Sequence, residues 1–269
     1  MKKIVTALLI VIVTISFGCS QNSDQDNNNI ISEQKQNDIE NHKQKNEQMD
    51  TIRSSRLAES ITVDSDGNNI VTNPDDLLVV SNKERYLPDG YEPQDLVIPN
   101  VPFPFEEKTE KKFMRKEAAK ALEEMFADAK ANNLNLYAQS GYRSYERQKT
   151  VFASNVKRLG EEDAKRVSAS PGQSEHQTGL AMDVTSPEVN FKLIVEFEQT
   201  PEGKWVLEHA HHYGFIIRYP KGKEAITGYD YEPWHLRYVG KEHAKYIKEN
   251  ELTLEEYLSE STPVHNEKS

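Results

Sequence analysis

The sequence predicts an α+β domain in which helices flank a small antiparallel sheet. Segments with the alternation of strands and segments with the spacing of amphipathic helices are mixed along the chain. They do not follow the regular strand–helix–strand order that is typical of a parallel sheet. The stretch that contains them, about residues 75–260, is of single-domain length, so we expect one folded domain there.

The first half of this stretch opens with Leu77–Val80, a short apolar run that we expect to be a strand. Apolar residues at helical spacing then predict one helix over about Glu110–Ala131. Leu134–Ala138 alternates and predicts a strand that leads into a turn. Ser144 follows the turn and is expected to cap the next helix.

The second half contains three further strands in the prediction, Leu180–Val184, Phe215–Tyr219 and Trp234–Tyr238. A helix is expected over Trp205–Tyr213, and its histidines are assigned to an amphipathic helix and not to a metal site. The sequence Thr253-Leu254-Glu255-Glu256 has the pattern of a capping box and predicts the start of the last helix.

The first 19 residues predict export. A short cationic start precedes Ile4–Phe17, an apolar run that is too short for a comfortable membrane-spanning helix. Cys19, the only cysteine of the chain, follows almost directly and excludes an internal disulfide. The arrangement resembles the lipobox of bacterial lipoproteins, which implies a lipid on Cys19. Simple cleavage and an uncleaved anchor stay open.

Residues 20–74 are rich in Asn, Gln, Asp, Glu, Lys and Ser, and predict a disordered polar tether. A flexible tail is expected over 261–269. The net charge of −11 argues against nucleic acid and against an anionic membrane surface as partners. From the export signal and Cys19 we expect the protein at the extracytoplasmic face of the cell membrane, held through its N-terminal anchor, and we expect a monomer.

A candidate metal site begins with His176 and Asp183, which are seven residues apart with Gly179 between them. In the predicted strand, Asp183 shares a face with Ala181, and a turn at Gly179 can bring His176 back over that face. One imidazole and one carboxylate would then point to a common position. A catalytic zinc ion usually takes three protein ligands, so a third is required.

The sequence Glu232-Pro233-Trp234-His235 offers that third ligand. His235 lies in the last predicted strand, on the same face as Arg237. Glu232, which Pro233 releases from the strand, can act as general base without binding the metal. Two imidazoles and one carboxylate suit zinc best among common divalent ions, and predict one Zn²⁺ per chain.

Two spaced motifs together resemble those of the zinc D-alanyl carboxypeptidases related to VanY and LdcB: Ser174-x-His176-x-x-Gly179-x-Ala181-x-Asp183 and Glu232-x-x-His235. The resemblance covers about Leu77–Leu258 and implies the fold of the VanY, LdcB and hedgehog-like peptidases. It also implies zinc on His176, Asp183 and His235, with Glu232 as catalytic base. The implied reaction is hydrolysis of the bond before a terminal D-alanine in peptidoglycan stem peptides.

The same family pattern contains a Tyr-Arg-Ser turn and a nearby glutamine, which are Tyr142-Arg143-Ser144 and Gln148 in this chain. Arg143 suits either the substrate carboxylate or the oxyanion that develops during hydrolysis. Gln148 and Ser174 can donate hydrogen bonds to the peptide or its carboxylate. Ser140 is a further candidate for the same task.

Several functions stay open at this point. L,D-cleavage of a tetrapeptide and D,D-cleavage of a pentapeptide need the same ligands and base, although the overall resemblance favours the L,D enzymes of the LdcB type. An endopeptidase is disfavoured because Arg143 and Gln148 fit a closed carboxylate pocket. A cell-wall-binding lipoprotein without turnover would have lost a ligand or the base, and all four are present.

Overall fold

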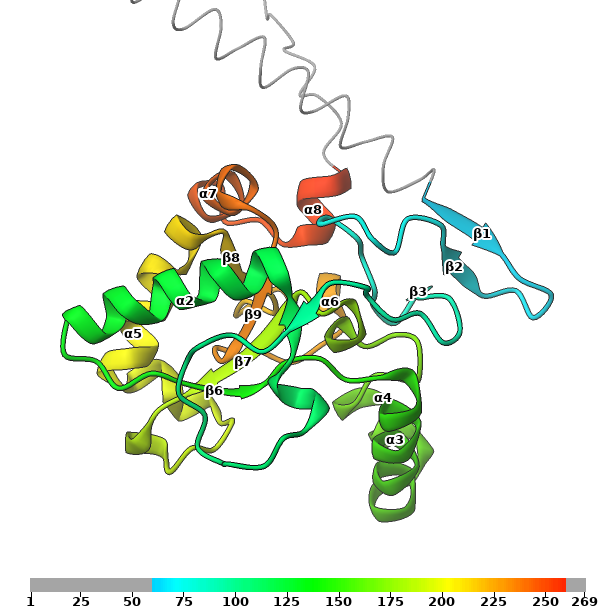
Figure 1. Cartoon of the computed structure of the whole chain (residues 1–269). Coiled ribbons are helices and arrows are strands. Elements are labelled where there is room, and N and C mark those ends of the chain that lie inside the picture. Colours follow the sequence, from blue (N-terminus) through cyan, green and yellow to red (C-terminus); the bar gives the residue numbers. More distant parts are fainter. Residues whose placement is uncertain (1–59, 260–269) are drawn as a thin grey trace, which may run out of the picture. The chain divides into compact units, whose positions relative to one another are not determined.

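The structure, a computed structural model, describes residues 60–259 (Figure 1). Its main sheet has four antiparallel strands in the order β6-β7-β9-β8, which confirms the α+β prediction. These strands are β6 (Tyr137–Ser140), β7 (Ala181–Thr185), β8 (Phe215–Ile217) and β9 (His235–Tyr238). The two smaller sheets consist of β1 (Ile61–Val63), β2 (Asn69–Val71) and β3 (Arg85–Tyr86), and of β4 (Leu96–Val97) and β5 (Met114–Arg115).

Helices surround the main sheet: α2 (Lys116–Ala131), α3 (Tyr145–Leu159), α4 (Glu161–Val167), α5 (Pro201–His209), α6 (Glu224–Thr227), α7 (Lys241–Glu249) and α8 (Leu254–Ser259). Short 3-10 helices are η1 (Glu110–Lys112), η2 (Glu175–Thr178), η3 (Pro187–Val189), η4 (Val195–Gln199) and η5 (Ala210–Tyr213). Within residues 60–259, no helix combines the length and apolar character needed to cross a membrane.

Helix α2 runs along the main sheet (Figure 1) and supplies much of the core. Leu122 and Met125 of α2 are fully buried in one cluster with Met182 of β7 and Leu236 of β9. Because successive side chains of a strand point to opposite faces, the residues next to Met182 and Leu236 project away from α2. Packing of α2 thus leaves the other face of β7 and β9 for polar side chains.

The structure corrects several of the predicted elements. The helix expected from Glu110 begins at Lys116, because Met114 and Arg115 pair with β4 instead. The strand expected from Leu134 begins at Tyr137, since the Leu134 backbone N–H still donates to the end of α2. Leu77–Val80 is not a strand, because two of its carbonyl groups accept hydrogen bonds from the Arg237 side chain.

The predicted tether is wrong for residues 60–74, where β1 and β2 form an antiparallel hairpin. The Asp64 carboxylate accepts hydrogen bonds from the backbone of Asp66 and Asn68, and Gly67 has a φ of 85°. Asp66-Gly67 is a known hairpin signal, which the polar composition of the segment obscured. The export signal, Cys19, residues 20–59 of the tether and the tail 261–269 lie outside the described residues.

Two predicted helix starts are confirmed. The Ser144 hydroxyl accepts a hydrogen bond from the Arg147 backbone and caps α3. At α8, the Thr253 hydroxyl accepts from the Glu256 backbone, and the Glu256 carboxylate accepts from the Thr253 backbone. This reciprocal capping box stabilises the first turn of α8.

Candidate active site

The structure brings His176, Asp183 and His235 together on the face of the main sheet opposite α2. Asp183 of β7 pairs directly with His235 of β9. Gly179, with a φ of 67°, turns the chain between η2 and β7, so that His176 lies beside Asp183 and His235. His235 Nδ1 is 2.9 Å from Asp183 Oδ1, and His176 Nε2 is 3.5 Å from Asp183 Oδ2.

These three buried side chains fit a metal ion. One ligand atom of each lies within 4.8 Å of the others, and no other such group occurs in the part of the chain that the structure describes. His176 Nδ1 lies 2.7 Å from the Gly141 carbonyl, to which it can donate, so Nε2 is left for a metal. Asp183 Oδ1 is buried without a hydrogen bond despite its proximity to His235.

The electrostatics of the group also suit a cation. Burial lowers the pKa of His176 to about 3, so its ring is neutral, as a metal ligand must be. Against the effect of burial, the Asp183 and Glu175 carboxylates raise the pKa of His235 to about 9. The carboxylates beside His235 thus favour positive charge there, which a metal ion would supply in place of the proton. Two imidazoles and one carboxylate are a typical zinc set.

Glu232 lies beside this group but outside it. Its carboxylate is 3.8 Å from His235 Nδ1, and its side chain is 28% exposed. Burial raises the pKa of Glu232 to about 7, against the lowering effect of His235, and Asp183 contributes to the rise. A carboxylate that titrates near neutrality can accept a proton and return it during one catalytic cycle.

A pocket of about 230 Å³ opens over the group. Arg143 and Ser174 line it, as the sequence predicts, and so do Tyr229 and Trp234, which the sequence reasoning did not identify. Among the described residues, Arg143 is the only lysine or arginine of this lining. The Tyr229 hydroxyl is buried without a hydrogen-bond partner in residues 60–259 and is therefore available to a ligand.

The side chain of Gln148, a predicted substrate contact, makes hydrogen bonds within the protein. Its side-chain oxygen accepts from Arg143 at 3.0 Å, and its nitrogen donates to the carbonyl of Ala169 at 2.5 Å. Gln148 is fully buried and does not line the pocket, so it holds Arg143 in place. Ser140 does not line this pocket either; it lies in the adjoining hollow, which shares Arg143.

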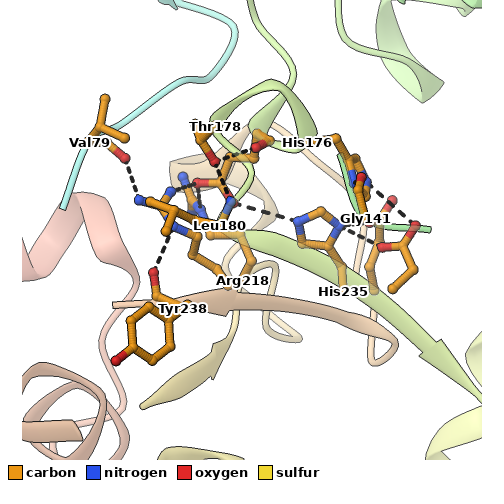
Figure 2. A network of polar contacts seen from close by, with 12 residues as sticks. Val79, Gly141, His176, Thr178, Leu180, Arg218, His235 and Tyr238 are labelled. Carbon is orange, nitrogen blue, oxygen red and sulfur yellow. Dashed lines mark hydrogen bonds and ion pairs between the residues drawn. The ribbon is translucent and has the colours of Figure 1, made fainter. Parts of the chain in front are cut away.

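Behind the metal group lies a buried ionic cluster that the sequence reasoning missed (Figure 2). Glu175 Oε1 accepts hydrogen bonds from Arg218 and Arg237, each at 2.6 Å. Although burial would raise it, the two arginines hold the pKa of Glu175 well below its usual range. The available signal was an arginine within each of two apolar strands, since such a side chain must meet a buried anion.

Known proteins resemble this chain in sequence and in fold. The family model for VanY, D-alanyl-D-alanine carboxypeptidase, matches residues 111–241. YodJ of Bacillus subtilis (strain 168), a protein assigned as a carboxypeptidase, is 57% identical over 193 residues, which are 72% of this chain and 71% of YodJ.

Two solved structures extend the similarity to the fold. The structure of the LdcB LD-carboxypeptidase has a TM-score of 0.71 and 56% identity, and the match covers 73% of this chain and 92% of that chain. A mutant of the vancomycin-resistance D,D-pentapeptidase VanY from a VanB-type cassette, in complex with Zn(II), has a TM-score of 0.53 and 30% identity. That match covers 67% of this chain and 98% of the other.

Proposed function

This chain belongs to the VanY/LdcB family of D-alanyl carboxypeptidases, and from that membership we propose that it is a zinc-dependent L,D-carboxypeptidase acting on peptidoglycan tetrapeptides. The observation that carries the proposal is the convergence of His176, Asp183 and His235 with Glu232 beside them. The L,D preference is supported by the 56% identity with LdcB, against 30% with the D,D enzyme. D,D-cleavage of pentapeptides is the second candidate, because the metal group and Glu232 suit both reactions.

In the proposed chemistry, the ion and the side chains around it have separate roles. When bound to the two imidazoles and Asp183, zinc supplies a Lewis acid for the scissile carbonyl and lowers the pKa of a water. Glu232 accepts the proton of the attacking water and returns it to the leaving amine of D-alanine. Arg143, held by Gln148, binds the negative charge of the substrate carboxylate or of the developing oxyanion.

The proposed location follows from the N-terminal sequence. An export signal that ends at Cys19 places the enzyme at the extracytoplasmic face of the cell membrane, and a lipid on Cys19 anchors it there. The polar residues between Cys19 and the folded part then allow the site to reach the cell wall. Loss of lipid attachment in a Cys19→Ser variant is the corresponding test, and an unchanged membrane fraction would contradict the anchor.

The pH dependence of D-alanine release reports on Glu232. The base must be ionised to accept a proton, so kcat/KM rises with pH through the pKa of Glu232. Burial raises that pKa to about 7 from its ordinary 4.5, and a bound dication favours the ionised form, so 7 is an upper bound. We expect an acidic limb below about pH 7 and above the ordinary range of a glutamate. A profile that is flat down to about pH 5 would contradict this assignment.

Substrate preference is measured by incubating the purified protein with the tetrapeptide and with the pentapeptide and following D-alanine by mass spectrometry. Loss of one alanine from the tetrapeptide, with no loss from the pentapeptide, is the predicted result. Release from the pentapeptide alone would make the chain a D,D-carboxypeptidase. Release from neither would favour a binding protein that retains the fold without turnover.

A further inference from the structure

We propose that Glu175 is a positioning residue of the metal site, which accepts a hydrogen bond from Nε2 of His235 and thereby leaves Nδ1 for the metal. The inference rests on the proposed zinc site, because it concerns the orientation of one of the ligands. Glu175 itself does not belong to the three-residue metal group. Its effect would be exerted through the ring of His235.

The geometry around His235 assigns different tasks to its two nitrogens. Nδ1 faces Asp183 Oδ1 at 2.9 Å, whereas Nε2 faces Glu175 Oε2 at 3.6 Å. Nε2 and Oε2 are both buried, and neither has a hydrogen-bond partner among the described residues. A buried donor and acceptor that face each other need only a small shift to form the missing bond.

Two buried arginines keep Glu175 suited to this task. Arg218 and Arg237 are both completely buried, and both donate to Oε1. Their charges compensate the buried carboxylate, which can then remain ionised and act only as an acceptor. Because both arginines use Oε1, the other oxygen is left for His235.

The two arginines are themselves held by residues near both ends of the described part of the chain. Arg237 donates to the carbonyl groups of Leu77 and Val79, each at 2.8 Å. Arg218 makes a bidentate pair with Glu255 of α8, at 2.6 and 2.8 Å. The position of the Glu175 carboxylate is therefore determined by well-packed elements on either side, as a residue that orients a ligand requires.

The other histidine has the opposite arrangement. His176 can donate its Nδ1–H to the Gly141 carbonyl and so presents Nε2 to the metal. Metal-binding histidines generally donate the second ring N–H to a carbonyl or carboxylate, which fixes tautomer and ring orientation. The two histidine ligands would therefore bind the metal through different ring nitrogens. The other nitrogen of each ring would donate to its own acceptor, the Gly141 carbonyl for His176 and the Glu175 carboxylate for His235.

This prediction can be tested on the wild-type protein. In the zinc-loaded protein with ¹⁵N-labelled histidine, NMR should show one ligand bound through Nδ1 with its proton on Nε2, and one with the reverse. The Nε2–H of His235 should exchange slowly with solvent because its partner is a buried carboxylate. Coordination of His235 through Nε2 would overturn the proposal without any need for a variant.

A matched pair of variants distinguishes two roles for Glu175: orienting the His235 ring and neutralising the buried arginines. Arg218 and Arg237 both need an acceptor at the position of Oε1, so Glu175→Gln would keep its oxygen there and turn its NH2 group, which cannot accept, toward His235. Glu255→Gln instead changes the other carboxylate that Arg218 contacts. We expect the zinc affinity of Glu175→Gln, measured by competition with a chelator, to fall about 10–100-fold and its His235 Nε2–H resonance to move. Glu255→Gln should keep the wild-type zinc affinity even if its unfolding temperature falls.

Equal losses of zinc affinity in both variants would reduce Glu175 to a structural ion pair and overturn the proposal. If Glu175→Gln does not fold, the proposal is tested by the NMR spectrum of the wild type, which shows whether His235 binds zinc through Nδ1 or Nε2. Failure of the proposal on Glu175 can be told apart from failure of the proposed carboxypeptidase activity, because zinc affinity is measured without substrate. A wild-type protein that binds zinc as described but releases no D-alanine would contradict the activity and leave the role of Glu175 intact.

Discussion

A Glu232→Gln variant is expected to bind zinc like the wild type and to release D-alanine about 10²–10⁴ times more slowly, because general acid–base catalysis contributes a factor of this size. Glutamine has nearly the shape of Glu232 but cannot accept the proton of the attacking water. The carboxylate lies beside the metal group and not within it, so its loss leaves the three ligands in place. The measurements are kcat for the tetrapeptide and bound zinc per chain.

Glu188→Gln is the control for this variant, because it makes the same change of charge at an exposed position of η3. It should retain wild-type kcat. If Glu232→Gln also retained its activity with zinc bound, Glu232 would have no part in proton transfer. If the variant lost zinc as well, the result would instead point to Glu232 as a ligand.

An Arg143→Ala variant is expected to lower kcat/KM by about 10²–10³-fold, since Arg143 is the only guanidinium among the described residues that line the pocket. The values of kcat and KM should be measured separately. A rise in KM with unchanged kcat assigns Arg143 to the substrate carboxylate, whereas a fall in kcat assigns it to the developing oxyanion. Zinc content should not change, because Arg143 is not a member of the metal group.

Arg158→Ala provides the matched control for Arg143, because Arg158 is an exposed arginine at the far end of the following helix, α3. Its kinetics should equal those of the wild type. An Arg143→Ala variant with the same kinetics as this control would show that another group, such as the Tyr229 hydroxyl, binds the negative charge of the substrate.

The metal group could be predicted from the sequence because its three members lie in two short motifs. Strand alternation places Asp183 and His235 opposite the apolar residues that pack on α2, and a glycine with positive φ returns His176 to them. These are local rules of period and turn chemistry. The fold class followed from the same rules, since each strand of the main sheet and the longer helices have their own periodic signal.

What the sequence did not predict depends on contacts between distant parts of the chain. The pairing of Glu175 with Arg218 and Arg237 joins η2 to the residue after β8 and to β9, which come 43 and 62 positions later, and no local pattern specifies it. The hydrogen bond from Gln148 to the carbonyl of Ala169 was not predictable either, because its acceptor is a backbone group that the sequence letters do not display. The N-terminal hairpin was missed because its polar composition outweighed one Asp-Gly turn.

The measurement that tests the central claim most directly is a zinc titration of the chelator-treated protein, with D-alanine release from the tetrapeptide and bound metal followed together. The account predicts that release is abolished by removal of the metal and rises in proportion to bound zinc, with saturation at one ion per chain. An Asp183→Asn variant should show neither binding nor release over the same range. Full activity in protein shown to contain no metal would contradict the account.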